Sequence, residues 1–216
     1  MSDTALLNTA VTAAQAAAAV LADVWQTDAG VNSEEGKDIK TQADLAAEQC
    51  LLDALRPTGL AILSEEQGAD EGFSLDTGGW IIDPLDGTMN FTRDLPIHAV
   101  SVGLWREHQP VLGVIVDIAR GETYQGIVGH GAALNGRQIH ASDVQSPQQA
   151  VLATGFPRAR SYVKSSLEAS LERIQAFKKV RMLGSATMSL ARADKRPCTP
   201  PCPQSDQSLA ACLAFP

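Results

Sequence analysis

The sequence has little positive charge. Its 216 residues include 17 Lys and Arg against 25 Asp and Glu, which gives a formal net charge of −8 at pH 7. A chain this acidic is poorly suited to non-specific binding of nucleic acid or of an anionic membrane. A phosphorylated substrate is not excluded, because bound cations can reverse the local field. We therefore expect no nucleic-acid partner and no membrane partner.

The sequence also lacks a long apolar run and a basic start. The apolar run at residues 16–22 is too short to span a bilayer. No Lys or Arg occurs before Lys37, so the basic segment that opens a signal peptide is missing. Together these two shortages predict a cytoplasmic protein.

Cysteine is scarce, and the histidines belong to no nucleophile motif. Of the four cysteines, Cys50 lies in a helical pattern and is interpreted as a core thiol. The pair Cys198 and Cys202 lacks a second ligand pair at zinc-finger spacing, which argues against a zinc site. No histidine pairs with Ser or Cys in a recognisable catalytic triad. We interpret His98, at the start of an expected strand, as a satisfied core group.

The order of the expected elements indicates layers of helix and sheet. Composition is that of an ordinary globular protein, 44% hydrophobic and 19% charged. Apolar periodicity predicts helices at residues 4–26, 41–55 and 161–177, with another from residue 184. Shorter apolar runs predict strands at residues 60–63, 80–83, 98–105, 111–118, 122–128, 132–134, 150–154 and 180–183. Hairpin turns are expected at residues 107–110 and 135–136, and loops at 28–36, 67–79 and 142–149.

Residues 80–91, with the sequence WIIDPLDGTMNF, form the most informative motif. The first three residues suit a covered strand, which Pro84 should end because proline cannot donate a ladder hydrogen bond. Gly87 permits a close backbone approach or a positive φ. Asp83 and Asp86 then share a stiff turn, where two negative charges repel unless a cation lies between them. A hard divalent cation fits this site. The alternative is an Asx-type turn in which both aspartates only cap backbone groups.

The string D-P-L-D-G-T-x-N-F after an apolar strand resembles the metal-binding signature of the inositol monophosphatase family. The resemblance extends from about residue 40 to residue 190. It implies an α+β fold, the layered α-β-α-β-α sandwich of the inositol monophosphatase and fructose-1,6-bisphosphatase type. It also implies Mg²⁺-dependent hydrolysis of a phosphate monoester by a metal-activated water, with two or three ions. Inositol monophosphate is the favoured substrate, and a 3′-phosphoadenosine nucleotide or fructose 1,6-bisphosphate are the alternatives.

The same resemblance implies a set of metal ligands. Glu65 resembles the acid that holds the first ion and orients the attacking water. Asp83 would bridge the two principal ions and face the bound phosphate, and Asp86 would bind the second ion. The main-chain carbonyl of Leu85 completes the set. Without the motif, the Glu65-Glu66 pair would be interpreted as a solvated edge.

Further residues match the catalytic and substrate positions of the family. Thr88 resembles the hydroxyl that shares the attacking water, and Asp44 resembles the acid behind it. The amides of Gly87 and Thr88 would contact the phosphate. Gly184 and Ser185 resemble the loop that meets the alcohol portion of the substrate. For Asp44 and Ser185, simple helix caps are the alternatives.

The end of the sequence departs from the family. Four prolines fall between Pro197 and Pro203, a density that no helix or interior strand tolerates. No Trp follows Trp105, so the Trp-Asp pair that normally gives the second ion another aspartate is missing. We expect an incomplete phosphatase-like domain at residues 1–192 and a foreign, disordered Pro/Cys-rich tail at 193–216, as after a reading-frame change. A genuine family-specific tail is the alternative.

Two classes of function therefore remain open. The first is a phosphatase of small phosphorylated substrates whose activity is impaired by the missing ligand. The second is an inactive relic or a non-catalytic binding protein on the same scaffold. The resemblance leaves a homodimer open in either case.

Overall fold

The computed structural model describes residues 1–27, 31–35, 38–142, 144–155, 164–192 and 196–197. The helices are α1 (Asp3–Thr27), α2 (Gln42–Leu55), α3 (Thr88–Thr92), α4 (Lys164–Ala176) and α5 (Ala186–Ala191), with 3-10 turns at Arg56–Thr58 and Pro147–Gln149. The strands are β1 (Val31–Glu35), β2 (Asp38–Thr41), β3 (Ile62–Ser64), β4 (Gly68–Ala69), β5 (Gly79–Asp86), β6 (Ala99–Arg106), β7 (Gln109–Asp117), β8 (Glu122–Ile127), β9 (Gly131–Leu134), β10 (Arg137–His140), β11 (Val151–Ala153), β12 (Lys179–Arg181) and β13 (Arg196–Pro197).

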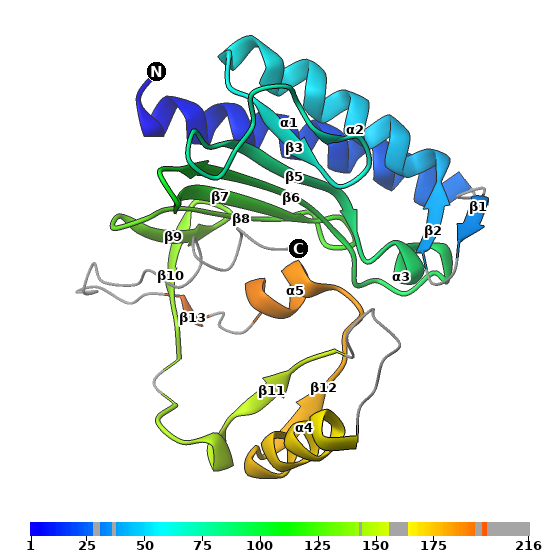
Figure 1. Cartoon of the computed structure of the whole chain (residues 1–216), viewed down its shortest axis with the longest axis vertical. Helices are drawn as coiled ribbons and strands as arrows, with labels where there is room; N and C mark the ends of the chain where they lie inside the picture. Colours follow the sequence, from blue (N-terminus) through cyan, green and yellow to red (C-terminus); the bar gives the residue numbers. More distant parts are fainter. Residues whose placement is uncertain (28–30, 36–37, 143, 156–163, 193–195, 198–216) are drawn as a thin grey trace.

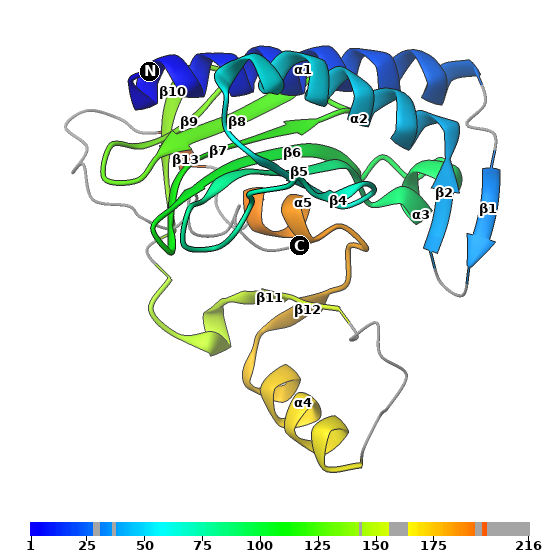
Figure 2. The same cartoon turned by 45° about the horizontal axis from the view of Figure 1, so that its top comes forward.

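The elements stack in five layers, which confirms the predicted α-β-α-β-α order. Figure 1 shows α1 and α2 above the large sheet, α5 beneath it, then the β11–β12 pair, and α4 outermost. The same order is visible in the turned view of Figure 2. Helix α5 therefore lies between the large sheet and the β11–β12 pair.

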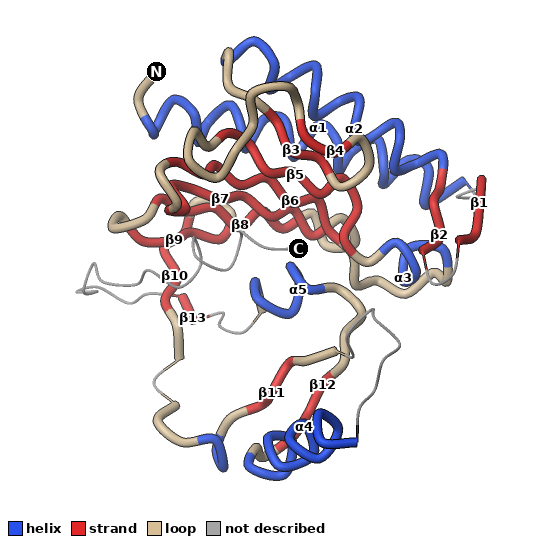
Figure 3. The backbone as a smooth tube through the Cα atoms, in the orientation of Figure 1, coloured by secondary structure: helices blue, strands red, loops and turns tan. Residues whose placement is uncertain are grey.

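Within the described residues, nine strands form the large sheet, in the order β13-β10-β9-β8-β7-β6-β5-β3-β4. Neighbouring strands in it are antiparallel except β3 and β5, which run parallel with Ser64 opposite Ile82. Strands β1 and β2 form a separate antiparallel hairpin, and β11 pairs with β12 in parallel. Figure 3 shows the strands of the large sheet side by side beneath the two long helices. The parallel β3–β5 pair matters most here, because it brings the end of β3 next to the aspartates of β5.

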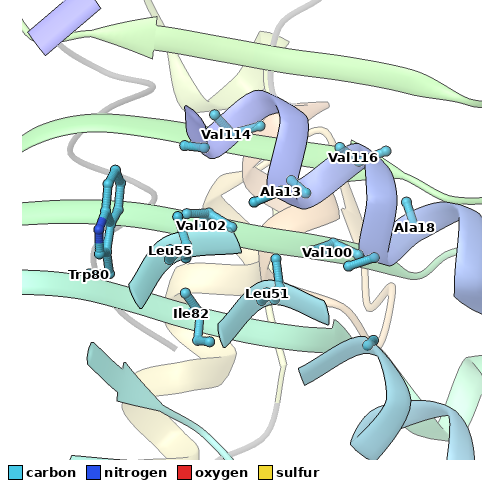
Figure 4. Packing of buried hydrophobic residues seen from close by; sticks show 14 of the residues in the cluster. Ala13, Ala18, Leu51, Leu55, Trp80, Ile82, Val100, Val102, Val114 and Val116 are labelled. Carbon is cyan, nitrogen blue, oxygen red and sulfur yellow. The ribbon is translucent and has the colours of Figure 1, made fainter. Parts of the chain in front are cut away.

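The main core lies between the large sheet and the two long helices. Side chains alternate across a strand, so Val100 and Val102 of β6 face α1 and α2 (Figure 4). Ala99 faces the opposite side, where it packs with Met188 of α5. Helix α1 contributes small residues such as Ala13, which is fully buried, and these let the helix approach the sheet closely.

By length and composition alone, helix α1 is long and apolar enough to cross a membrane, with a mean hydropathy of 1.5 within Asp3–Trp25. Its apolar stripe is nevertheless buried against the sheet, with Ala10, Ala17 and Leu21 at 0% exposure. Such a stripe is the pattern of a core helix. We therefore assign α1 to the core of the domain.

The prediction that Pro84 ends its strand is wrong. Strand β5 continues to Asp86, and its register against β6 shifts between Asp83 and Asp86. A register shift of this kind leaves a residue outside the hydrogen-bond ladder, and proline is tolerated there. The strand therefore carries both aspartates to its own end instead of leaving them in a loop.

Other boundaries also differ from the prediction. The loop expected at residues 28–36 includes strand β1, which pairs with β2. Strand β10, at Arg137–His140, was not predicted. Both expected hairpin turns are confirmed, with positive φ at Glu107 and His108 and at Asn135.

Most of the expected foreign tail lies outside the described residues. Only Arg196 and Pro197 of it are described, and these form β13 beside β10, with Pro197 opposite Ile139. The division of the chain at residue 192 stays a prediction.

Candidate active site

The turn at the end of β5 is held by its own polar groups. Asp83 is half-buried, and its Oδ1 accepts a hydrogen bond from the Leu85 amide at 3.1 Å. The Thr88 hydroxyl donates to the Leu85 carbonyl at 3.0 Å. Asp83 therefore makes the backbone-capping hydrogen bond of an Asx turn, as the alternative interpretation of the motif expects.

Two other carboxylates lie near enough to Asp83 to affect its charge. Burial raises the pKa of Asp83 well above its ordinary value, and the negative charges of Asp86 and Glu65 and a hydrogen bond with Glu65 raise it further. The Leu85 amide acts in the opposite direction, because its hydrogen bond favours the ionised form. The predicted proximity of Glu65, Asp83 and Asp86 is therefore present, and it creates a concentration of negative charge.

Glu65 reaches this point because β3 runs parallel to β5. The Glu65 amide donates to the Ile82 carbonyl at 3.2 Å, one residue before Asp83. Glu65 itself is exposed in the turn after β3, and Glu66 is half-buried. The Glu65-Glu66 pair is therefore not a fully solvated edge, because Glu65 shares a hydrogen bond with Asp83 and Glu66 is half-buried.

A buried acid that the sequence reasoning missed supports this turn. Glu48 of α2 is 1% exposed, and its Oε1 accepts hydrogen bonds from the Ser64 hydroxyl and from the Gln67 amide at 3.1 Å. Its Oε2 accepts from Gln67 Nε2 at 3.0 Å. The available signal was spacing, because Glu48 lies four residues after Asp44 and so on the same helix face. Asp44 is 3% exposed, in the first turn of α2, and this helix packs against β5.

The expected substrate-side loop meets Asp86. Asp86 Oδ2 accepts hydrogen bonds from the hydroxyls of Ser185 and Thr187 and from the Thr187 amide at 3.0 Å, and its Oδ1 accepts from the Ala186 amide at 3.2 Å. Ser185 is also the N-cap of α5, since its hydroxyl accepts from the Met188 amide at 3.2 Å. The helix-cap alternative for Ser185 is therefore confirmed, and its substrate-side role stays a prediction.

Asn90 ties the motif to this loop and was also missed, although it lies inside the motif. Its buried Nδ2 donates to the Ile97 carbonyl at 2.8 Å and to the Leu183 carbonyl at 2.7 Å. Gly184 has φ of +71°, and a Cβ there would come within 3.0 Å of the Asn90 side chain. Gly87 has φ of +89°, and its Cβ would lie 2.8 Å from the Ile97 carbonyl. Both glycines are therefore required by the close approach of the two segments.

The far end of α5 is held by a second aspartate of the sheet. Asp117 is fully buried in β7, and its Oδ2 accepts hydrogen bonds from Arg192 at 2.7 Å and from Arg120 Nη1 at 3.3 Å. Helix α5 is thus attached at its start to Asp86 of β5 and just past its end to Asp117 of β7.

The residues present fit a hard divalent cation by their chemistry. All the expected donors are oxygens, which hard divalent cations prefer. Burial and then the charges of Asp86 and Glu65 raise the pKa of Asp83, and a cation would relieve the repulsion among these charges. Among the described residues, however, no three His, Cys, Asp or Glu side chains already converge on one point as ligands. Both oxygens of Asp86 are engaged by α5. Binding of a cation therefore requires these carboxylates to turn toward one another.

Comparisons with known proteins agree on one family. The sequence profile described as the inositol monophosphatase family matches residues 2–194. The chain is 36% identical over 191 residues to the "Nus factor SuhB" of Escherichia coli K12, covering 86% of this chain and 71% of that protein. The inositol monophosphatase from Anabaena superposes with a TM-score of 0.75 at 33% identity, covering 88% of this chain and 71% of that one. The suhB protein of Bartonella henselae superposes with a TM-score of 0.78 at 28% identity, covering 88% and 74%.

Proposed function

Because this chain belongs to the inositol monophosphatase family, we propose that it hydrolyses a phosphate monoester with the help of Mg²⁺. Inositol monophosphate is the first candidate substrate, and a 3′-phosphoadenosine nucleotide and fructose 1,6-bisphosphate are the alternatives. The observation that carries the proposal is that Asp86 and Glu65 lie near the Asp83 carboxyl at the end of β5, where burial first and then the charges of these two acids raise its pKa. Carboxylates that repel one another at a strand end are suited to a divalent cation.

Four oxygen donors would hold the ions. They are the carboxylates of Glu65, Asp83 and Asp86 and the carbonyl of Leu85. Bound Mg²⁺ supplies two kinds of help to such a reaction, since it neutralises charge on the phosphoryl group and lowers the pKa of a bound water. Without the Trp-Asp pair of the family, the second ion would rest on Asp83 and Asp86 with water in its remaining positions, an arrangement that Mg²⁺ accepts at reduced affinity.

The chain's own residues would orient the attacking water. Thr88 commits its hydroxyl hydrogen to the Leu85 carbonyl at 3.0 Å, so its oxygen is available to accept a hydrogen bond from that water. Glu65 would accept the water's other hydrogen, because it lies beside Asp83. The buried Asp44 of α2, on the helix that packs against β5, would support this group from behind.

The substrate would lie between the motif and α5. The amides of Gly87 and Thr88, where α3 begins, would donate to phosphate oxygens. Ser185 and the start of α5 would face the alcohol portion, since this segment already contacts Asp86. Gly184 keeps the segment close by fitting against Asn90.

A non-catalytic binding role is the second candidate. It is favoured by the engagement of both Asp86 oxygens with α5 and by the lack of any Trp after Trp105. The relatives whose name is Nus factor SuhB carry the same scaffold. In this case the domain would keep its layers and lose its need for a metal.

Phosphate release tests the proposal. The chain is incubated with Mg²⁺ and each of the three substrates, beside Asp83→Asn and the control Asp53→Asn, which changes an exposed aspartate on the far side of α2. We expect release from one substrate, reduction to background in Asp83→Asn because a bridging charge is lost, and no change in the control. Equal release by Asp83→Asn, or no Mg²⁺ or Mn²⁺ binding at millimolar concentration in calorimetry, contradicts the phosphatase.

A further inference from the structure

Glu48 lies outside the proposed ligand set, yet its contacts all lead to one proposed ligand. Its carboxylate is 1% exposed and accepts three hydrogen bonds, one from the Ser64 hydroxyl and two from Gln67. Ser64 and Gln67 stand immediately before and after the Glu65-Glu66 pair. Glu48 therefore holds both ends of the segment that carries Glu65.

The segment has a second attachment on its other side. The Glu65 amide donates to the Ile82 carbonyl of β5 at 3.2 Å, and Ser64 pairs with Ile82 in the parallel register. The backbone of Glu65 is thus fixed between α2 and β5. These attachments leave the Glu65 side chain directed at Asp83, with which it shares a hydrogen bond.

A buried carboxylate at position 48 carries a desolvation cost that an apolar side chain would not carry. The neighbouring inward-facing residues of α2 are Leu51, Leu52 and Leu55, and an apolar residue at position 48 would join them without any desolvation cost. Burying a carboxylate is tolerated only when hydrogen bonds compensate it, and here the donors come from the Ser64–Gln67 turn. The acid is therefore matched to the geometry of this turn and not to the packing of the helix.

We propose that Glu48 is a positioning residue for Glu65 and that, through it, Glu48 sets the affinity of the site for its first metal ion. The proposal rests on the proposed function, because it assumes that Glu65 is a metal ligand. Partners that orient metal ligands typically contribute roughly 10–100-fold to metal affinity or activity. Within the described part of the chain, the hydrogen bonds of Glu48 go to Ser64 and Gln67 and not to the segment at Asp86, so substrate affinity should depend on Glu48 far less than metal affinity.

The test compares variants of the full chain by calorimetric titration with Mn²⁺ and Mg²⁺, by kcat and KM for phosphate release, and by thermal unfolding. Glu48→Ala should weaken metal binding roughly 10–100-fold and lower kcat while KM for the substrate changes little. Glu48→Gln should restore affinity to within about threefold, because its oxygen still accepts from the Ser64 hydroxyl and the Gln67 backbone amide. The side-chain carboxamide of Gln67 can flip, so that its oxygen accepts from the new nitrogen. Glu172→Ala, an exposed glutamate of α4, is the control and should match the parent chain.

The possible outcomes separate this inference from the proposed function. If the parent chain binds no metal, the proposed function fails and this inference fails with it. If the parent chain binds metal and Glu48→Ala binds it equally well, only this inference fails. A lower unfolding temperature with unchanged metal affinity would show a purely structural role and overturn it. Should Glu48→Ala not fold, Ser64→Ala decides, since it removes one donor from a small side chain: weakened metal binding supports the inference and unchanged binding overturns it.

Discussion

Two buried ionisable side chains close to the site lack the environment that their charged forms need. Burial and the charges of Asp86 and Glu65 raise the pKa of Asp83 and so favour its neutral form. His98 is fully buried, and neither ring nitrogen has a hydrogen-bond partner among the described residues, so its interpretation as a satisfied core group is wrong. A bound cation would relieve the first conflict, whereas the charges of Asp117 and Asp94 only partly offset the burial of His98. The first conflict belongs to the proposed chemistry, whereas the second affects only stability.

His98 packs edge-on against two aromatic rings, with its ring centroid 4.7 Å from that of Trp25 and 5.2 Å from that of Phe91. Burial lowers the pKa of His98 from 6.5 to about 4, although the charges of Asp117 and Asp94 act to raise it. At pH values between these two pKa values, His98 is protonated in the unfolded chain and neutral in the folded chain. Stability attributable to His98 is complete above about pH 6.5 and is lost as the pH falls toward 4, and linkage gives a loss of about 2 kcal/mol at pH 5.

We expect His98→Leu to remove this part of the acid sensitivity. Urea unfolding at pH 7 and pH 5 measures it as the change in unfolding free energy between the two pH values, which should shrink by about 2 kcal/mol relative to the parent chain. His130→Gln, at an exposed position, serves as the control and should leave the difference unaltered. An undiminished pH effect in His98→Leu would mean that the imidazole is solvated in solution.

At the scale of elements, helix α5 is short and depends on its two attachments. A helix of this length is not stable by propensity alone. Its start is fixed by hydrogen bonds to Asp86, and the residue after its end, Arg192, is fixed by a 2.7 Å contact with the buried Asp117. The substrate-side segment therefore depends on an ion pair at the opposite end of the helix.

Arg192→Ala should loosen α5 and lower the stability of the domain. Among the described residues, Asp117 would keep the Arg120 amide at 3.2 Å and Arg120 Nη1 at 3.3 Å, and the Arg120 side chain is 44% exposed. We therefore expect a loss of about 1–3 kcal/mol. Arg106→Ala is a matched control, because its pair with Asp3 is exposed at 45% and 42% and should contribute less than about 1 kcal/mol. Urea unfolding gives the two free energies, and hydrogen exchange should show faster exchange in α5 only for Arg192→Ala. Equal effects of the two substitutions would contradict the role given to Asp117.

The elements that could be predicted from the sequence are those whose signal is local. Apolar runs located six strands of the large sheet, β3 and β5 to β9, whereas β4, β10 and β13 were not predicted. The N-cap Ser185 located the start of α5. The β1–β2 hairpin was missed because its residues are polar and its pairing partner, not its composition, makes it a strand. Glu48 and Asn90 were missed for a related reason, since Glu48 has partners 16 and 19 residues away and one of the two partners of Asn90 lies 93 residues away along the chain. A local motif can indicate candidate ligands, whereas the groups that orient them are identified only from contacts in the folded structure.

At the scale of the whole molecule, the candidate site lies where three layers meet. Strand β5 of the large sheet supplies Asp83 and Asp86, α2 above it supplies Asp44 and Glu48, and α5 beneath it supplies the substrate-side segment. Asp86 and Asn90 join the motif to that segment. Any change that separates the layers should therefore affect the site before it unfolds the core.

The Pro-rich end of the chain should contribute nothing to these layers. The family match ends at residue 194, and four prolines follow between Pro197 and Pro203. Removing residues 198–216 should therefore leave metal affinity unchanged and should move the thermal midpoint by less than about 2 °C, which for a domain of this size corresponds to well under about 1 kcal/mol.

A second truncation that removes residues 193–216 provides the comparison. It also deletes β13, whose Arg196 and Pro197 pair with His140 and Ile139 of β10, so it tests whether that short pairing adds stability. We expect a small decrease in the midpoint for this second chain and none for the first. Differential scanning calorimetry distinguishes them, and amide exchange of the full chain gives an independent check, because amides beyond residue 197 should exchange without protection. Strong protection there, or a large drop in the midpoint on removing residues 198–216, would show that the tail belongs to the fold and that the domain does not end near residue 192.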